Sequence, residues 1–283
     1  MKKILAIALF TSVLFSCKKE ETKVVEEPKV STEKIISLNG AITETLAKLG
    51  EEGNIIGVDV TSNYPESLKN TAKELGHVRS ISAESIIALK PTVIYASDKD
   101  LNSELASKLK ASGIKLEIIN QEFSTEGTSK LIADVAKSLN KENFQPIIDD
   151  VQTKVKSLKT IEKKPKVLFI YARGAGNLMV AGKDTPLEKM ITLAGGENAT
   201  NEFSDFKPLT PEALLTNNPD IILMFDSGLQ SIGGKDGLMK IEGISATNAA
   251  KNGKIISMEG QFLSGFGPRL GDAAIELNKL LQK

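Results

Sequence analysis

The chain has 283 residues with 36 basic and 36 acidic side chains, and 41% of its residues are apolar. This apolar fraction is enough for a globular core, and the length suits one large domain or two smaller ones. Balanced charge argues against a nucleic-acid-binding protein, which usually carries a basic excess. One Cys and one His exclude an internal disulfide, a thiolate metal site and a multi-histidine zinc site.

Residues 1–16 have the pattern of a secretory signal peptide. Lysines at positions 2 and 3 precede an apolar run that is shorter than the roughly 20 residues needed to span a membrane. The only Cys follows at once, as Cys17 in a Leu-Phe-Ser-Cys sequence that resembles the lipobox of bacterial lipoproteins. The resemblance implies cleavage before Cys17 and its acylation, and a plain signal peptide with an incidental Cys is the alternative. We expect a cell-envelope protein that contacts the membrane only through this lipid.

Residues 17–33 comprise the acylated Cys and a polar, charged, Pro-containing segment without apolar periodicity. Such a composition is typical of a flexible tether.

From residue 34 the apolar pattern alternates between short strands and helices. The expected strands are 34–38, 54–60, 92–96 and 115–119, and the expected helices are 41–49, 83–89 and 102–112. This alternation predicts an α/β lobe over residues 34–140 with a mainly parallel sheet.

Two amphipathic segments follow, at 125–138 and at about 144–158, with a break near Asn140. The second has apolar residues at helical spacing, and its only Pro lies in the first turn, where Pro is tolerated. We expect residues 141–164 to form a backbone helix that links the first lobe to a second α/β lobe at 165–283.

The second lobe starts with an expected strand at 166–171 and then repeats part of the first. Residues 82–94 and 210–222 share one pattern at a constant offset of 128 (210 minus 82). Each copy has a hydroxyl residue that can cap a helix, a Glu in the first turn, a Pro that ends the helix and an apolar strand. Internal duplication explains the pattern, and convergence on the same signals is the alternative. The expected fold class is α/β, with two lobes of mainly parallel sheets joined by one long backbone helix.

Two such lobes form a cleft between them, where small ligands usually bind. The sequence offers little for catalysis, because His77 is the only His and neither G-x-S-x-G nor G-K-[ST] occurs. We therefore expect a binding protein and not an enzyme. The alternative from another class is a cell-surface lipoprotein enzyme with His77 as its base.

Only three of the basic residues are Arg, namely Arg79, Arg173 and Arg269, and the other 33 are Lys. All three lie in expected loops with Gly nearby. Loops at the carboxyl ends of parallel strands converge on a ligand crevice, and a guanidinium can hold a carboxylate through two hydrogen bonds. These residues are candidate contacts for ligand carboxylates, and structural support of the loops is the alternative role.

Several motifs resemble those of the haem (hemin) receptors of bacterial ABC importers, within the wider group of substrate-binding proteins whose lobes are joined by a rigid helix. The resemblance covers about residues 34–283. Its motifs include Ile36-Ser37-Leu38-Asn39-Gly40, Gly76-His77-Val78-Arg79, Leu89-Lys90-Pro91, Val180-Ala181-Gly182-Lys183, Leu193-Ala194-Gly195-Gly196-Glu197-Asn198 and Phe266-Gly267-Pro268-Arg269. The motifs that begin at Ile36, Leu89 and Leu193 are shared with cobalamin and siderophore receptors. The motifs that begin at Gly76, Val180 and Phe266 point more specifically to haem.

The resemblance implies a monomeric protein that binds haem in the interlobe cleft for iron acquisition. His77 stands where many of these receptors have a Tyr that ligates the haem iron, and imidazole can take the same role. Arg79 and Arg173 are then expected on the propionates, and Tyr171 on the second side of the iron. Further candidates for the pocket are Tyr64, Met179, Met258, Phe266 and Arg269.

The resemblance also implies delivery to an ABC permease dimer with ATPase subunits. In the wider group one acidic residue on each lobe docks on the permease, and Glu84 and Glu212 occupy equivalent positions of the repeat. A carboxylate that merely stabilises its helix terminus is the alternative. Cobalamin and iron-siderophore complexes are the alternative ligands.

Overall fold

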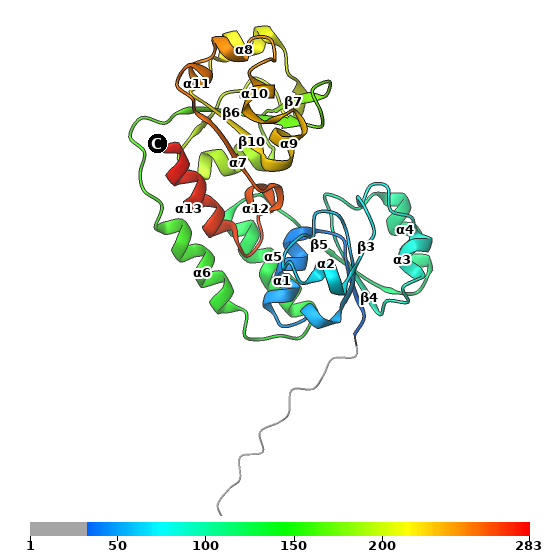
Figure 1. The fold of residues 1–283 in the computed structure, drawn as a ribbon. Helices are drawn as coiled ribbons and strands as arrows, with labels where there is room; N and C mark the ends of the chain where they lie inside the picture. Colours follow the sequence, from blue (N-terminus) through cyan, green and yellow to red (C-terminus); the bar gives the residue numbers. More distant parts are fainter. Residues whose placement is uncertain (1–32) are drawn as a thin grey trace, which may run out of the picture. The chain divides into compact units, whose positions relative to one another are not determined.

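The computed structural model describes residues 33–283 and folds them into two lobes, each built on its own sheet (Figure 1). The signal peptide, Cys17 and most of the tether lie outside the described residues. No helix within residues 33–283 is long and apolar enough to cross a bilayer.

The first lobe has an all-parallel sheet with the strand order β3-β2-β1-β4-β5. Its strands are β1 Ile35–Ser37, β2 Ile55–Val58, β3 Lys73–Glu74, β4 Val93–Ser97 and β5 Lys115–Ile119. Its helices are α1 Gly40–Lys48, α2 Leu68–Thr71, α3 Ala83–Ile87, α4 Ser103–Ala111 and α5 Thr125–Ser138, with a 3-10 turn at Glu52–Asn54. The central strands β1 and β4 are buried along their whole length, as expected for parallel strands covered on both faces.

The second lobe has a mixed sheet with the order β11-β10-β6-β7-β9, and β8 pairs with β6. Its strands are β6 Lys166–Ala172, β7 Leu178–Ala181, β8 Glu197–Asn198, β9 Phe206–Pro208, β10 Ile221–Phe225 and β11 Ile255–Met258. Its helices are α7 Pro186–Leu193, α8 Pro211–Asn217, α9 Asp226–Ser231, α10 Gly234–Leu238, α11 Asn248–Lys251, α12 Gly260–Ser264 and α13 Leu270–Leu281, with a 3-10 turn at Ile244–Ala246.

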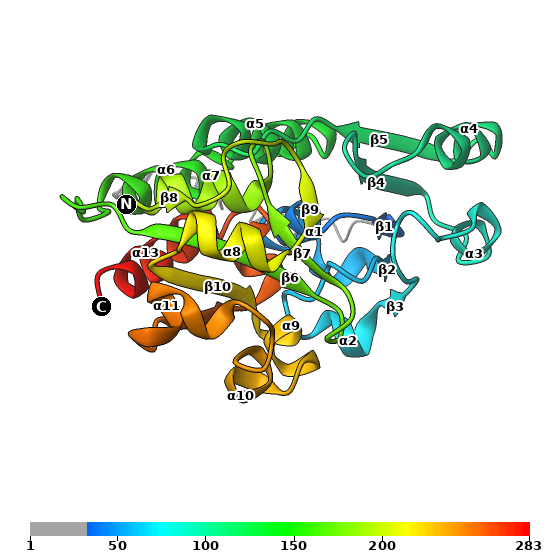
Figure 2. The ribbon, with the colours of Figure 1, turned by 90° about the horizontal axis from the view of Figure 1, so that it is seen from above.

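Two antiparallel pairings distinguish this second sheet from the first. β6 turns directly into β7, and β9 pairs antiparallel with β7 (Figure 2). The expectation of a mainly parallel sheet therefore describes β10, β11 and β6, while one side of the sheet is a hairpin extension that the sequence pattern did not reveal.

The repeat seen in the sequence is a repeat of structure. β4 and β10 begin at Val93 and Ile221 and end at Ser97 and Phe225, so both bounds keep the offset of 128 (221 minus 93). Each strand follows a short helix whose capping hydroxyl accepts a backbone N–H, from Ser85 at Ser82 and from Ala213 at Thr210. The backbone agrees as well, because Lys90 and Asn218, each followed by Pro, both adopt left-handed φ values of 52° and 37°.

The linking helix is shorter than predicted. α6 covers Gln145–Lys156, 12 residues, instead of the expected 141–164. It is separated from α5 by a turn in which Asn140 has a φ of 55°. The connection is thus two helices, and α6 packs on both α5 and α13 (Figure 1).

Helix α5 belongs to the cores of both lobes. Leu131 and Val135 pack in the first-lobe core with Ile42 and Tyr95, whereas Ile132 packs in the second-lobe core with residues of α6 and α13. Since adjacent residues of one helix are committed to different cores, the helix couples the two lobes.

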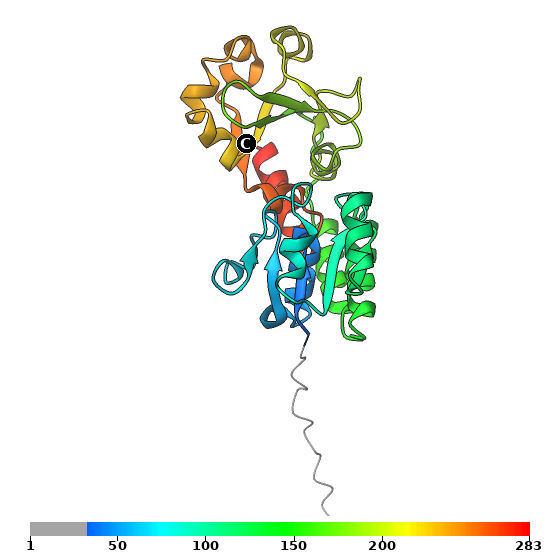
Figure 3. The same cartoon turned by 90° about the vertical axis from the view of Figure 1, so that its right-hand side faces the viewer.

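The segment before α13 forms a further connection between the lobes (Figure 3). The Gln121 side chain donates to the Gly265 carbonyl at 3.0 Å, and the Thr128 hydroxyl donates to the Phe266 carbonyl at 2.9 Å. A Cβ on Gly267 would lie 3.0 Å from the Ala41 Cα, so this position needs Gly for the close approach to α1.

An ion pair between a buried carboxylate and a half-buried guanidinium completes this connection. The Arg269 guanidinium donates to both carboxylate oxygens of Glu44 at 3.0 and 2.6 Å, and the two side chains are 20% and 4% exposed. The guanidinium also lies over the Tyr64 ring at 4.0 Å and the Phe262 ring at 5.0 Å. Burial raises the pKa of the Glu44 carboxyl, and the hydrogen bond and charge of Arg269 oppose that rise.

We predict that Arg269→Met lowers the free energy of unfolding by about 3 kcal/mol near neutral pH, because Glu44 would remain buried without its counter-charge. Urea denaturation measures this loss. The deficit should shrink as the pH falls. Without Arg269, burial and the charge of Glu259 raise the pKa of Glu44 further, and protonation then removes the uncompensated charge.

The exposed Arg173 provides the matched control, and Arg173→Met should change stability by less than about 0.5 kcal/mol. A similar small loss for Arg269→Met would contradict the structural role of the ion pair. Combining Glu44→Gln with Arg269→Met should recover part of the lost stability.

Candidate functional site

A cavity of about 640 Å³ is lined by residues of both lobes. The first lobe contributes Arg79, Lys99, Asp100, Gln121, Glu122 and Phe123, and the second contributes Asp184, Thr185, Pro186, Lys189, Asp205 and Phe206. Its volume falls within the usual range for a small-molecule site.

The first-lobe residues follow the carboxyl ends of β3, β4 and β5, the edge of a parallel sheet where ligands bind. Hydrogen bonds hold this edge in place, because the Asn39 amide donates to Asp100 at 2.9 Å and to Gln121 at 3.1 Å. The second-lobe residues come from the end of β7, the start of α7 and the start of β9.

The cavity lining contains three cationic and four anionic side chains. A dianionic ligand would therefore gain little from the overall field of the cavity. Recognition of its carboxylates would depend on individual donors at short range, such as the guanidinium fork of Arg79.

The three Arg residues have different surroundings. Arg269 is fully engaged by Glu44, which makes it a structural residue of the lobe connection and leaves it outside the cavity lining. Arg79 and Arg173 are exposed, and neither forms an ion pair with another residue of the range 33–283. Their guanidinium groups are the ones that a ligand carboxylate could reach.

His77 and Arg79 share one loop, directly after β3. The His77 side chain is exposed, and its Nδ1 accepts the Arg79 backbone N–H at 3.3 Å. The His77 carbonyl in turn accepts the backbone N–H groups of Ser80 and Ile81. These bonds hold the loop in one conformation, with the far ring nitrogen, Nε2, left for an external partner. Arg79 belongs to the lining of the interlobe cavity, and His77 does not.

Tyr171, Met179 and Phe206 share one face of the second sheet. They lie on β6, β7 and β9, which are neighbours in the sheet (Figure 2). Tyr171 pairs with Met179, Met179 pairs with Pro208, and Phe206 lies two residues before Pro208 on the same strand. The rings of Tyr171 and Phe206 are 6.4 Å apart, and the Arg173 guanidinium lies 5.7 Å from the Tyr171 ring. Of this face, Phe206 lines the interlobe cavity, whereas Tyr171, Met179 and the neighbouring Arg173 lie outside its lining.

Three other candidates from the sequence lie elsewhere. Met258 and Phe266 are buried in the second-lobe core, and Phe266 packs edge-on against Phe123 at 5.5 Å. Tyr64 stacks against Arg269 and lines a separate small cavity beside Glu44. None of these three belongs to the lining of the interlobe cavity.

Glu84 and Glu212 are both exposed in the first turns of α3 and α8. Hydrogen bonds from its own backbone N–H and from the Ser82 hydroxyl lower the pKa of Glu84. The carboxylate is therefore kept charged on the surface.

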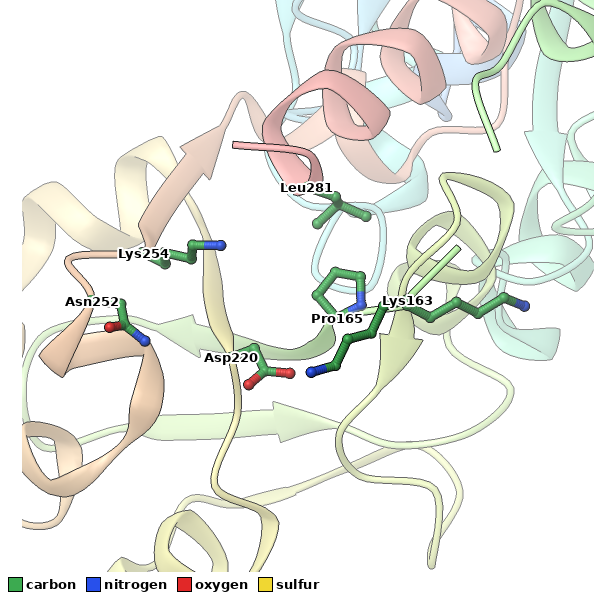
Figure 4. A pocket seen from close by; sticks show the side chains of 7 residues that line it. Lys163, Pro165, Asp220, Asn252, Lys254 and Leu281 are labelled. Carbon is green, nitrogen blue, oxygen red and sulfur yellow. The ribbon is translucent and has the colours of Figure 1, made fainter. Parts of the chain in front are cut away.

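A second cavity, of about 240 Å³, lies at the opposite edge of the second sheet. Pro165, Asp220 and Lys254 directly precede β6, β10 and β11, so they mark the amino-terminal edge of these strands (Figure 4). Asp220 already accepts the Lys166 backbone N–H at 3.0 Å. Because ligands of such sheets bind at the carboxyl ends, we assign the functional site to the interlobe cavity.

Sequence reasoning missed most of the cavity lining. Phe123, Phe206, Lys99 and Lys189 carry no motif, and their position depends on how the two lobes meet. One signal was available for Phe206, since it is a large aromatic in a segment that is otherwise polar, and the structure leaves it 39% exposed.

Comparison with known proteins places these features in context. Residues 35–261 match the family model described as periplasmic binding protein. A relative from Bacillus subtilis strain 168, the uncharacterized ABC transporter substrate-binding lipoprotein YvrC, is 26% identical over 95% of this chain and 85% of its own length. A vitamin B12-binding protein of Vibrio campbellii is 28% identical over 67% of this chain and 70% of its own.

Among solved structures, the chain is similar to the periplasmic heme-binding protein RhuT from Roseiflexus sp. RS-1 in its apo form. The TM-score is 0.85 and the identity 34%, and the match covers 89% of this chain and 98% of the other. The fold of this chain thus matches that of a solved periplasmic heme-binding protein over nearly the whole length of that protein.

Proposed function

The chain belongs to the periplasmic binding protein family, as an ABC transporter substrate-binding protein, and we propose that haem is the ligand it carries. Haem would bind between the lobes and pass to the permease without a chemical step on this protein. The similarity to a heme-binding protein of the same two-lobed fold supports this ligand.

The contrast among the three Arg residues is the observation that carries the proposal. Arg269 is fully engaged by Glu44, whereas Arg79, which lines the cavity, and Arg173, 5.7 Å from the Tyr171 ring, have no acidic partner within residues 33–283. Haem presents two propionate carboxylates, and two available guanidinium forks match them in number and in chemistry.

The second support is the face formed by Tyr171, Met179 and Phe206. A porphyrin is flat and largely apolar, and this face offers two rings and a thioether next to a polar cavity. The phenol of Tyr171 would be the contact on the second side of the iron.

His77 would supply the axial ligand. Ligation through Nε2 by a neutral imidazole requires the proton on Nδ1, yet Nδ1 accepts the Arg79 N–H in the structure. Haem binding should therefore break this 3.3 Å bond and turn the exposed ring. Loss of this bond would also free the loop between His77 and Arg79, so that the Arg79 guanidinium could move toward the ligand.

Vitamin B12 is the second candidate ligand, because a vitamin B12-binding protein is among the relatives. Cobalamin carries amide side chains where haem has carboxylates, so it has less use for unpaired guanidinium groups. An iron-siderophore complex is a third candidate, and a catecholate would use Arg without needing the imidazole of His77.

Delivery would follow docking of the protein on an ABC permease dimer with ATPase subunits. We propose Glu84 and Glu212, exposed at equivalent positions of the two lobes, as the docking carboxylates. We further propose that Cys17 is acylated and holds the monomeric protein at the cell envelope.

Titration of the purified protein with hemin tests the ligand. We predict a shifted Soret band that saturates, and an altered Soret position with weaker binding for His77→Ala, because an axial ligand is lost. No Soret shift with the unmodified protein would exclude haem, and an unchanged shift in the variant would remove His77 from the site. Cyanocobalamin in place of hemin tests the second candidate.

The double substitution Arg79→Lys with Arg173→Lys preserves charge but removes the planar forks. We predict a hemin affinity about 10-fold to 100-fold weaker, from the loss of one to three kcal/mol in charge-assisted hydrogen bonds. Lys254→Ala, at the second cavity, removes a positive charge elsewhere and should leave hemin affinity unchanged. Equal affinity of the double variant and the unmodified protein would contradict propionate binding by these residues.

The anchor is tested by expressing the full chain in bacteria supplied with a radiolabelled fatty acid. We predict label in the unmodified protein and none after Cys17→Ser, because Cys17 is the only thiol in the chain. Label that persists in the variant would contradict acylation at this position.

A further inference from the structure

Two large apolar side chains are exposed on the helices that carry the docking carboxylates. Ile87 on α3 is 37% exposed and Leu215 on α8 is 60% exposed. They are equivalent in the repeat, with the same offset of 128 (215 minus 87). Each lies three residues after its Glu, and side chains at this spacing are neighbours on one helix face.

The adjacent residues show why this exposure is unusual. Ile86 and Leu214, also equivalent in the repeat, are completely buried and attach α3 and α8 to their lobes. Each short helix thus has one apolar residue for the core and a second that contacts solvent. Packing within the described part of the chain accounts for Ile86 and Leu214 but leaves Ile87 and Leu215 without a role.

The charges on these faces indicate the chemistry of a partner. Neither Glu84 nor Glu212 forms an ion pair within residues 33–283, and hydrogen bonds that lower the pKa of Glu84 keep it ionised. A complementary surface would carry a cation for the Glu and an apolar recess one helical turn away. Since the two faces are related by an internal repeat, a partner built from two like subunits fits both.

We infer that Ile87 and Leu215 insert into apolar recesses of the two permease subunits, each beside the cation that receives Glu84 or Glu212. The inference rests on the transporter partnership proposed above and adds the apolar half of each contact. Burial of the side chain removes water from around the ion pair and so strengthens it.

The two contacts are unequal. Leu215 exposes a larger fraction of its side chain than Ile87 and has more apolar area to bury. The second lobe therefore contributes more of the docking free energy.

Binding of the full chain, without haem, to the permease–ATPase complex in lipid nanodiscs tests this inference. We expect about 10-fold weaker binding for Leu215→Gln and about threefold weaker binding for Ile87→Gln. The loss of affinity in the double variant should be close to the product of these two factors, because the two sites lie in different lobes and act independently. Met239→Gln is the matched control, since Met239 is 40% exposed and lies outside both helices.

Hemin titration of the same variants separates this inference from the ligand proposal. Unchanged hemin affinity with weakened permease binding supports the apolar contacts. The inference would be overturned if Leu215→Gln and Ile87→Gln bound the permease fully while Glu84→Gln and Glu212→Gln bound it weakly. That result would keep the docking role of the two carboxylates. No permease binding by the unmodified chain would overturn both, whatever hemin does.

Discussion

The ion pair between Glu44 and Arg269 is the constraint on which the arrangement of the lobes depends. Glu44 lies on α1 of the first lobe, and Arg269 directly precedes α13 of the second. Around it, Gln121 and Thr128 donate to the two carbonyls of the same turn, and α5 shares its residues between both cores. The interlobe cavity is bounded by Gln121 itself, so the interactions that join the lobes also shape the site. A cavity built in this way is preformed, and its ligand would require local loop movements more than wide closure of the lobes.

The geometry of the guanidinium group explains why this chain has Arg at three positions and Lys elsewhere. At the lobe junction a planar guanidinium satisfies both oxygens of a buried carboxylate while its faces lie against Tyr64 and Phe262, which the compact ammonium of Lys could not do. The same geometry, left unpaired at Arg79 and Arg173, is suited to carboxylates of a ligand. On the proposed function, one residue type serves internal structure at one position and recognition at two others, and the presence or absence of an acidic neighbour distinguishes them.

The sequence was most informative where local signals determine structure. The capped helices, the buried strands and the 128-residue repeat were all predictable, because N-caps, Pro and apolar periodicity act within a few residues. The β6–β7 hairpin was missed, since the turn at 173–177 interrupts a strand pattern without the usual hairpin dipeptide. The site was harder still. Arg79 was expected beside the ligand cavity and lines it, whereas Arg269, Met258 and Phe266 were expected there and are held elsewhere by an ion pair and by core packing. Their partners are distant in sequence, so no local pattern could have identified them.

The two lobes are similar in some elements and different in others, and the differences lie near the cavity. Strands β4 and β10 have the same length, and helices α3 and α8 share an N-cap hydroxyl and one equivalent buried residue, Ile86 or Leu214. Only the second lobe has the antiparallel strands β7 and β9 within residues 33–283. Of the residues on these two strands, Phe206 lines the cavity, so the added strands give one side of the cavity a wall that has no counterpart in the repeat. A partner made of two like subunits places the opposite demand on the chain, because it meets both lobes in the same way. On the proposed function, the repeat is retained on the surfaces that face the permease and is lost at the cavity, where the two lobes contact different parts of one molecule.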